Sequence, residues 1–286
     1  MNNALPSAMQ SDRKTVSVII PTLGRESLKH CLDALERQTR RPDEVIVIHD
    51  IEKKGGAYGR NAGVAQASGE LIAITDDDCV PPNDWLANMI TIMEKYDADV
   101  VGGTMFETDP FLDAVRKRRS FPLSVQEDSS GVVGNTANII YKRSILEECL
   151  RRDGHIFTKT GDDIELIWRI QQMGAKVMYS PNPVLHLRKV TPLSYLSRQF
   201  TRGITVATLY KANRKSKQKF VAQPSLLWGH GRNGQSAEWL KVLWFKVVGP
   251  FDVKSFQSLA DFFVFWLGEK IQGIGFVWGL FLKTHP

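Results

Sequence analysis

Residues 59–86 read GRNAGVAQASGELIAITDDDCVPPNDWL, and this stretch decides the fold class. Residues 59–68 have helical character, residues 71–75 (LIAIT) are a continuous apolar run, and three aspartates follow without a break. A short apolar run between turn-forming residues is typical of a strand that is buried on both faces. We therefore predict a helix, a buried strand and an acidic turn in direct succession.

Similar patterns upstream and downstream predict an alternation of strands and helices. Further strands are expected at residues 16–21 (VSVIIP), 44–49 (EVIVIH) and 100–103, and further helices at residues 25–39 and 83–96, the second with Asn83 as its N-cap. Strands that alternate with helices predict an α/β fold, a three-layer sandwich around a mostly parallel sheet.

The ends of the predicted strands carry polar residues, and ligands bind beyond the carboxyl ends of strands in such sheets. Thr22, His49 with Asp50, and residues 76–78 each follow a predicted strand directly. The three acids repel one another, and a divalent cation would relieve this repulsion because hard cations bind carboxylate oxygens. In extended backbone Asp76 and Asp78 would point to one side and Asp77 to the other. The alternative is an acidic turn that caps the next helix.

A second acidic site is predicted in residues 105–190, where we expect a strand at 138–141, a helix at 162–173 and a strand at 176–180 followed by a Pro-x-Pro turn. On that helix Glu165 and Arg169 are a favourable i,i+4 pair. Asp163 shares the apolar face of Leu166, Ile167 and Ile170, so it points inward, where a purely structural carboxylate is unusual. The alternative is a helix N-terminus stabilised by its acids through the helix dipole.

Two segments resemble the signature of the family 2 glycosyltransferases. They are residues 16–25 (VSVIIPTLGR), which resemble the opening strand, and residues 59–86, with an Arg-Asn pair, an Ala-x-Gly-Glu turn and an Asp-x-Asp motif in the family's order. The resemblance extends over residues 16–190. It implies the GT-A (Rossmann-like) fold and an inverting transfer of a sugar from a nucleoside-diphosphate sugar to an acceptor hydroxyl, with Mn²⁺ or Mg²⁺ as cofactor.

The resemblance also implies roles for individual residues. Asp163 is the catalytic base, and Asp162 stands where the family usually has Glu. The metal is held by Asp78, with Asp76 and His186 beside it. A lone histidine is otherwise more often an ordinary core or surface residue. The expected nucleotide-sugar contacts are Pro21, Thr22, His49, Asp50, Arg60, Asn61, Asp76, Asp77 and Asn135.

One departure from the family concerns the nucleobase. The second strand of family members usually ends in acidic residues and a Gly-Ser turn, whereas this chain has His49-Asp50-Ile51-Glu52. His49 stands in the position of the carboxylate that contacts the uracil edge, which favours a donor other than a uridine nucleotide.

The charge distribution predicts a membrane-facing C-terminal region. The net charge of +6 divides into −7 for residues 1–165 and +13 for residues 166–286, and five of the seven Trp follow residue 227. Basic residues beside aromatic rings suit an anionic membrane surface. The alternative is a basic solvated face over an aromatic core. The longest uncharged stretch near the C-terminus, residues 271–282, is shorter than the ~20 apolar residues that cross a bilayer. We expect an in-plane or re-entrant segment, with a buried core helix as the alternative.

The chain therefore divides into a disordered N-terminus (1–13), a nucleotide-sugar-binding half (14–104), an acceptor and catalytic-base half (105–190) and a basic, aromatic-rich helical region (191–286). We predict a peripheral, monotopic enzyme at the cytoplasmic face of the membrane, with a carbohydrate or lipid-linked acceptor, in polysaccharide or glycolipid assembly. No nucleic-acid partner is expected, because the basic residues 211–219 match no known nucleic-acid-binding pattern. The three cysteines suggest free, buried thiols in a reduced compartment.

Two other functions fit the same fold. A sugar-phosphate nucleotidyltransferase usually has a Gly-rich phosphate loop after the first strand, where this chain has PTLGRES with a single Gly. The second is a non-catalytic membrane-bound scaffold, which would not need Asp76, Asp78 and Asp163. All three are present in this chain, which argues against a scaffold.

Overall fold

A single eight-stranded sheet forms the centre of the protein, in the order β2-β1-β3-β7-β5-β8-β4, with β6 beside β8. The computed structural model describes residues 13–117, 125–127, 136–158, 162–213 and 258–282. The strands are β1 (Val16–Thr22), β2 (Glu44–His49), β3 (Leu71–Ile74), β4 (Cys79–Val80), β5 (Val100–Glu107), β6 (Gln126–Glu127), β7 (Ile139–Lys142) and β8 (Val177–His186). Strands β1, β2, β3, β5 and β8 run in one direction, and β4, β6 and β7 oppose them.

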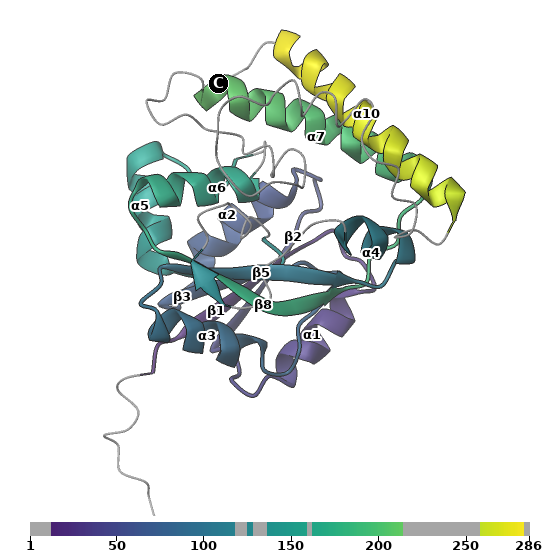
Figure 1. Cartoon of the computed structure of the whole chain (residues 1–286). Coiled ribbons are helices and arrows are strands. Elements are labelled where there is room, and N and C mark those ends of the chain that lie inside the picture. Colours follow the sequence, from purple (N-terminus) through teal and green to yellow (C-terminus); the bar gives the residue numbers. More distant parts are fainter. Residues whose placement is uncertain (1–12, 118–124, 128–135, 159–161, 214–257, 283–286) are drawn as a thin grey trace, which may run out of the picture.

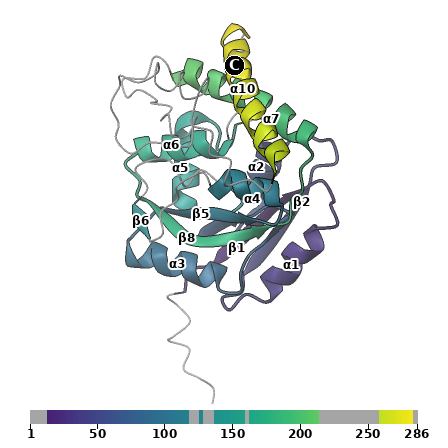
Figure 2. The same ribbon diagram turned by 45° about the vertical axis from the view of Figure 1, so that its right-hand side comes forward.

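Helices cover both faces of this sheet, which confirms the predicted three-layer α/β sandwich (Figure 1). One face carries α1 (Leu28–Glu36) and α3 (Trp85–Lys95), and the other carries α2 (Gly56–Gln66), α5 (Arg143–Asp153) and α6 (Asp162–Gln172). Beyond α2 and α6, Figure 2 shows α7 (Pro192–Asn213) and α10 (Leu259–Phe281) crossing above the short helix α4 (Pro110–Lys117).

Alternating side chains of the strands build two hydrophobic cores. On β1, Val18 and Ile20 face the core under α1 and α3, whereas Ile19 faces the core under α2, α5 and α6. All three side chains are fully buried, as expected of a strand covered on both faces. Cys31, Cys79 and Cys149 are free and buried within the same layers.

Some predicted boundaries were wrong. The first helix is shorter than residues 25–39, and α3 begins at Trp85, after Asp84 rather than after Asn83. Asn83 does not cap α3, because the N–H of Asn88 donates to the carbonyl oxygen of Asp84 at 2.9 Å. The carbonyl oxygen of Asn83 instead accepts the backbone N–H of Thr39 at 2.8 Å and joins the segment before α3 to the segment after α1.

The prediction of a strand at 176–180 followed by a Pro-x-Pro turn was also wrong, because β8 continues to His186. Opposite a register shift between Gly103 and Met105, β8 bulges over residues 181–183, so its two prolines need not donate ladder hydrogen bonds. Asn138 closes the bulge: its Nδ2 donates to the carbonyl oxygens of Thr104 (2.7 Å) and Asn182 (3.0 Å). This continuation brings His186 to the carboxyl end of the sheet.

Asn138→Ala should destabilise the fold. The side chain is fully buried, and its Oδ1 also accepts the indole N–H of Trp85 at 2.9 Å. Its removal leaves the Trp85 N–H and the carbonyl oxygens of Thr104 and Asn182 without the Asn138 side chain as a partner. This loss should lower the free energy of unfolding by about 2–4 kcal/mol. Urea denaturation measures the change, with Asn88→Ala at a half-buried position of α3 as control. A loss below about 0.5 kcal/mol would contradict this account of the bulge.

Helices α7 and α10 pack closely because glycines line their contact. A Cβ on Gly203 would collide with the backbone at Gln272, and one on Gly275 would collide with the backbone at Phe200. Within the described part of the chain, no helix has both the length and the apolar character needed to cross a bilayer. Most of the basic tract at 211–219 lies outside the described residues, as does the N-terminal segment 1–12.

Candidate active site

The three aspartates form a turn between β3 and β4. The backbone N–H of Cys79 donates to the carbonyl oxygen of Asp76 at 3.0 Å, so the predicted alternation of extended backbone does not hold. Asp77 turns into the protein, where its carboxylate accepts the Thr22 hydroxyl (2.6 Å) and the Arg25 guanidinium (2.7 Å). The same Arg25 nitrogen lies 3.1 Å from Asp78. Asp77 thus anchors the turn, and the more exposed carboxylates are those of Asp76 and Asp78.

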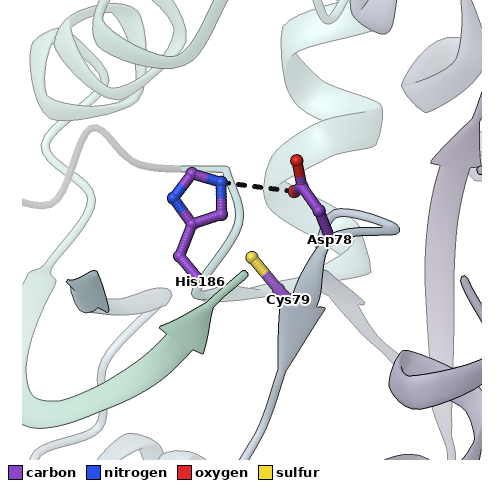
Figure 3. Close-up of side chains that lie close together, drawn as sticks. All are labelled: Asp78, Cys79 and His186. Atoms are coloured by element: carbon purple, nitrogen blue, oxygen red, sulfur yellow. Dashed lines mark ion pairs between the residues drawn. The ribbon is translucent and has the colours of Figure 1, made fainter. Parts of the chain in front are cut away.

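Asp78 lies against His186, as Figure 3 shows. The two-residue strand β4 pairs with the end of β8 and places Cys79 opposite His186. In this arrangement Nε2 of His186 is 3.3 Å from Oδ1 of Asp78, and Nδ1 is 2.7 Å from Oε2 of Glu107. Residues from β3–β4, β5 and β8 therefore meet at one edge of the sheet.

The pKa values reflect this cluster of charges. Burial alone would lower the pKa of His186, but its hydrogen bonds to Asp78 and Glu107 outweigh burial and raise it to about 9. Burial opposes ionisation of Asp78, yet the His186 contact and the charges of Arg25 and Arg188 hold its pKa below the usual range. At neutral pH the structure therefore holds an ionised carboxylate beside a protonated imidazole.

These donors suit a hard or borderline divalent cation. Ligand atoms of Asp78, Cys79 and His186 all lie within 4.8 Å of one another. Burial, reinforced by the charges of Asp76 and Asp78, raises the pKa of the Cys79 thiol well above its usual value. Among these groups, the carboxylate oxygen of Asp78 and an imidazole nitrogen of His186 are donors that fit Mn²⁺ or Mg²⁺.

The residues expected near the nucleoside lie at the ends of β1 and β2. Thr22 is buried and, besides donating to Asp77, its hydroxyl accepts the backbone N–H of Gly24 at 2.8 Å. Asp50 is also buried, and its carboxylate accepts the backbone N–H groups of Lys54 (2.8 Å) and Gly55 (2.6 Å). His49, directly opposite Thr22 in the β1–β2 pairing, is exposed. Of these residues, His49 presents its side chain to solvent, while Thr22 and Asp50 order the loops.

Helix α2 adds Arg60 to this edge of the sheet. Arg60 Nη2 lies 3.2 Å from Oδ1 of Asp76, and a Cβ on Gly56 would come within 2.8 Å of Arg60 Nη1. Similarly, a Cβ on Gly59 would lie 2.8 Å from the Pro21 side chain. Glycines at 56 and 59 therefore let α2 approach β1 and leave room for the guanidinium.

Asn61 makes a contact that its predicted donor-binding role did not include. Its Nδ2 donates to the carbonyl oxygen of Phe157 (2.9 Å), and its Oδ1 accepts the Phe157 N–H (3.0 Å). The donor and the acceptor of the side-chain amide thus both bind the segment that precedes α6 and connect it to α2. The structure gives Asn61 the geometry of a clamp between the two halves of the domain.

Helix α6 begins at Asp162, as predicted, and packs its apolar face into the core. Leu166, Ile167 and Ile170 are buried, and Arg169 pairs with Glu165 at 2.7 Å. The side chains of Asp162 and Asp163 lie outside the described part of the structure, as does Asn135. The backbone of Asp163 is in the first turn of α6.

Two charged residues of the cluster were not predicted from the sequence. Arg25 was interpreted as the start of a helix and the end of the family-like segment 16–25, with no contact assigned to it, but it bridges Asp77 and Asp78. Glu107 stands in the sequence Met-Phe-Glu-Thr, which carries no motif, and its contact with His186 depends on the β5–β8 pairing. A basic residue three positions after the first strand was the only sequence feature that pointed to either contact.

Comparison with known proteins gives consistent matches. The family model "Glycosyl transferase family 2" matches residues 47–150, which include Arg60 and Asp78 but end before Asp163 and His186. Glycosyltransferase AglE of Haloferax volcanii is 24% identical over 246 residues, 75% of this chain and 80% of that protein. The O-antigen chain rhamnosyltransferase RfbN of Salmonella typhimurium is 25% identical over 240 residues, 66% of this chain and 71% of that protein.

Among solved structures, the mannosyltransferase PcManGT of Pyrobaculum calidifontis, in complex with GDP-Man and Mn²⁺, matches with a TM-score of 0.57 and 16% identity, over 95% of this chain and 88% of that one. The fold and these relatives define a glycosyltransferase with the GT-A fold. The family model over residues 47–150 and the curated relatives support a family 2 glycosyltransferase.

Proposed function

We propose that this enzyme transfers a sugar from a nucleoside-diphosphate sugar to an acceptor hydroxyl, with inversion at the anomeric carbon and with a divalent cation. The observation that carries the proposal is the Asp78–His186 pair, 3.3 Å apart at the carboxyl end of the sheet. Ligands of α/β sheets bind at this edge. Arg25 and Arg60, which contact Asp78 and Asp76, add positive charge where a diphosphate would lie.

In this proposal Asp78 and His186 hold the cation, with Asp76 beside them. Bound there, Mn²⁺ or Mg²⁺ supplies positive charge that stabilises the departing diphosphate. Arg60 is a buried residue of α2 and reaches Asp76, so it holds that carboxylate in place. Asp77 is assigned to the fold of the turn, because its carboxylate is occupied by Thr22 and Arg25.

The proposed base is Asp163, which removes the acceptor hydroxyl proton as the new bond forms. Two clamps support its placement. Asn61 holds Phe157 to α2, and Arg169 of α6 donates to the carbonyl oxygen of His155 and pairs with Asp153. These contacts tie α6, through the segment at residues 153–157, to the helix that carries Arg60. A single direct displacement from the face opposite the diphosphate inverts the anomeric centre.

The donor nucleobase is the property to test first. The exposed His49 at the end of β2 replaces the carboxylate that family members use for uracil, and the similar Pyrobaculum enzyme holds GDP-Man. We propose a guanosine diphosphate sugar as the donor. A hydrolysis screen of UDP-, GDP- and dTDP-sugars with Mn²⁺ should show turnover with a GDP-sugar. Formation of a nucleotide sugar from a sugar phosphate instead would establish the nucleotidyltransferase alternative.

We also propose that α10 docks on an anionic membrane surface. Its exposed face carries Phe263, Ile274, Trp278 and Phe281, of which Phe281 is 83% exposed. Lys270 lies over the ring of Trp266 at 5.1 Å, a cation beside an aromatic ring on the same helix. Such a helix lies in the plane of the interface, which would suit a lipid-linked acceptor at the cytoplasmic face.

Replacing Trp278 and Phe281 together by aspartate should release the protein from vesicles that contain anionic lipid. Each large apolar side chain contributes about 1.5–3 kcal/mol when buried, so the partition coefficient should fall at least tenfold. Vesicle sedimentation measures it, with Leu150→Asp on α5 as the control, since Leu150 is also exposed. Equal loss in the control, or none in the double variant, would contradict docking by α10.

A further inference from the structure

His186 is held at both ring nitrogens, and the partner at Nδ1 has no role in the proposed chemistry. Oε2 of Glu107 lies 2.7 Å from Nδ1 of His186, and both side chains are buried, with relative exposures of 3% and 6%. The backbone is fixed as well, because Thr108 donates its N–H and its hydroxyl to the His186 carbonyl oxygen, both at 3.1 Å.

Glu107 is in turn fixed by Arg116 of α4. Nε of Arg116 donates to Oε1 of Glu107 at 2.9 Å, and Nη2 makes a second, shorter contact with the same oxygen. One carboxylate oxygen therefore faces Arg116 and the other faces His186. Helix α4 starts at a fixed place, since Asp109 accepts the N–H groups of Phe111 and Leu112 at 3.0 Å and that of Val190 at 3.2 Å.

This arrangement determines which nitrogen of His186 can bind a cation. A carboxylate paired with a guanidinium only accepts hydrogen bonds, so the proton on the Glu107 side must belong to Nδ1. A cation at this site would replace the second ring proton, so with Nδ1 protonated toward Glu107 the lone pair that binds the metal is on Nε2, the nitrogen that faces Asp78. A metal-bound histidine is commonly oriented in this way by a carboxylate on its other nitrogen.

We propose that Glu107, braced by Arg116, is a positioning residue that sets the tautomer and ring orientation of His186 for metal binding. The inference rests on the proposed metal-dependent function, and it assigns roles to two residues that do not touch the donor. The experiment compares Mn²⁺ binding by the wild-type protein and Glu107→Gln, in the presence of GDP. Gln keeps the shape of the side chain but can present either an N–H or an oxygen to Nδ1, so it no longer enforces one tautomer.

We expect the Mn²⁺ affinity of Glu107→Gln to be about 10–100-fold weaker than that of the wild-type protein. The EPR signal of free Mn²⁺ measures this affinity. Pulsed EPR should detect the imidazole nitrogen of His186 coupled to Mn²⁺ in the wild-type protein and show that coupling reduced in the variant. Arg116→Gln should weaken Mn²⁺ binding in the same direction. Glu94→Gln on the exposed face of α3 makes the same chemical change and should bind as the wild type does.

A double-mutant cycle separates positioning from general structural damage. In a His186→Asn background, Glu107→Gln should have no further effect on Mn²⁺ affinity if Glu107 acts through His186. Equal affinity in wild-type and Glu107→Gln proteins, or the same fold-loss in the His186→Asn background, would overturn this inference alone. Wild-type protein that binds no Mn²⁺ in the presence of GDP would overturn the proposed metal site as well.

Discussion

Asp163→Asn should bind the donor as tightly as the wild-type enzyme does and should transfer almost no sugar. Asparagine has nearly the same shape as aspartate, but it cannot accept the acceptor proton. Loss of a general base lowers the rate by about 10²- to 10⁴-fold. The fold should be unaffected, because α6 is held by the burial of Leu166, Ile167 and Ile170 and by the Glu165–Arg169 pair.

Calorimetry measures the donor affinity of each protein, and a single-turnover assay measures the rate of product formation. The neighbouring Asp162→Asn is the matched comparison, since it makes the same change one position earlier in the same helix. It should retain substantially more activity, because Asp162 lies on the polar stripe with Glu165. Transfer by Asp163→Asn at nearly the wild-type rate would refute its assignment as the base.

Asp78→Ala should abolish the metal-dependent part of donor binding. The carboxylate is one of two proposed metal ligands, and its removal leaves His186 without a partner at Nε2. With Mn²⁺ present we expect donor affinity to fall roughly 100-fold or more, to the value that the wild-type protein shows in EDTA. Calorimetric titration with Mn²⁺ and with EDTA measures both values.

Asp84→Ala provides the control for Asp78→Ala. Asp84 is exposed at the N-cap of α3 and its side chain makes no capping hydrogen bond, so its loss should leave donor binding unchanged. Thermal unfolding without metal checks that Asp78→Ala remains folded. Retention of a strong Mn²⁺ effect on donor affinity in Asp78→Ala would show that the cation binds elsewhere.

The parts of the fold that the sequence predicted are those set by local patterns. The apolar runs of β1, β2 and β3 and the apolar face of α6 are all present, although β2 lies at the edge of the sheet and buries only Ile46 and Ile48. Thr22, Asp76 and Asp78 were placed near strand ends because parallel strands end at one edge. These predictions needed no knowledge of which distant strands pair.

The parts that the sequence did not predict depend on contacts between distant residues. Strand β4 is two residues long and exists through its pairing with β8, so no periodicity marks it. The prolines that suggested a turn are instead absorbed in the bulge of β8, which Asn138 closes. Glu107 and His186 are 79 positions apart, and only the β5–β8 register brings them together.

The conformation of the acidic turn at residues 76–78 was also not predicted correctly from the sequence. Alternation of Asp76, Asp77 and Asp78 was argued from extended backbone, but the hydrogen bond from Cys79 to Asp76 turns the chain. Asp77 is then drawn inward by Thr22 and Arg25, residues more than fifty positions away. Asn61, which was predicted to contact the donor, also binds Phe157, a residue 96 positions away that the sequence did not indicate.

The position of the cation tests the account most directly. A crystal of the protein grown with Mn²⁺ and GDP would locate the ion by its anomalous scattering. The account predicts one Mn²⁺ bonded to the carboxylate of Asp78 and Nε2 of His186, with diphosphate oxygens completing its shell and the Asp163 carboxyl facing the same cavity. An ion bound away from both side chains, or Asp163 on a different surface of the molecule from Asp78, would contradict it.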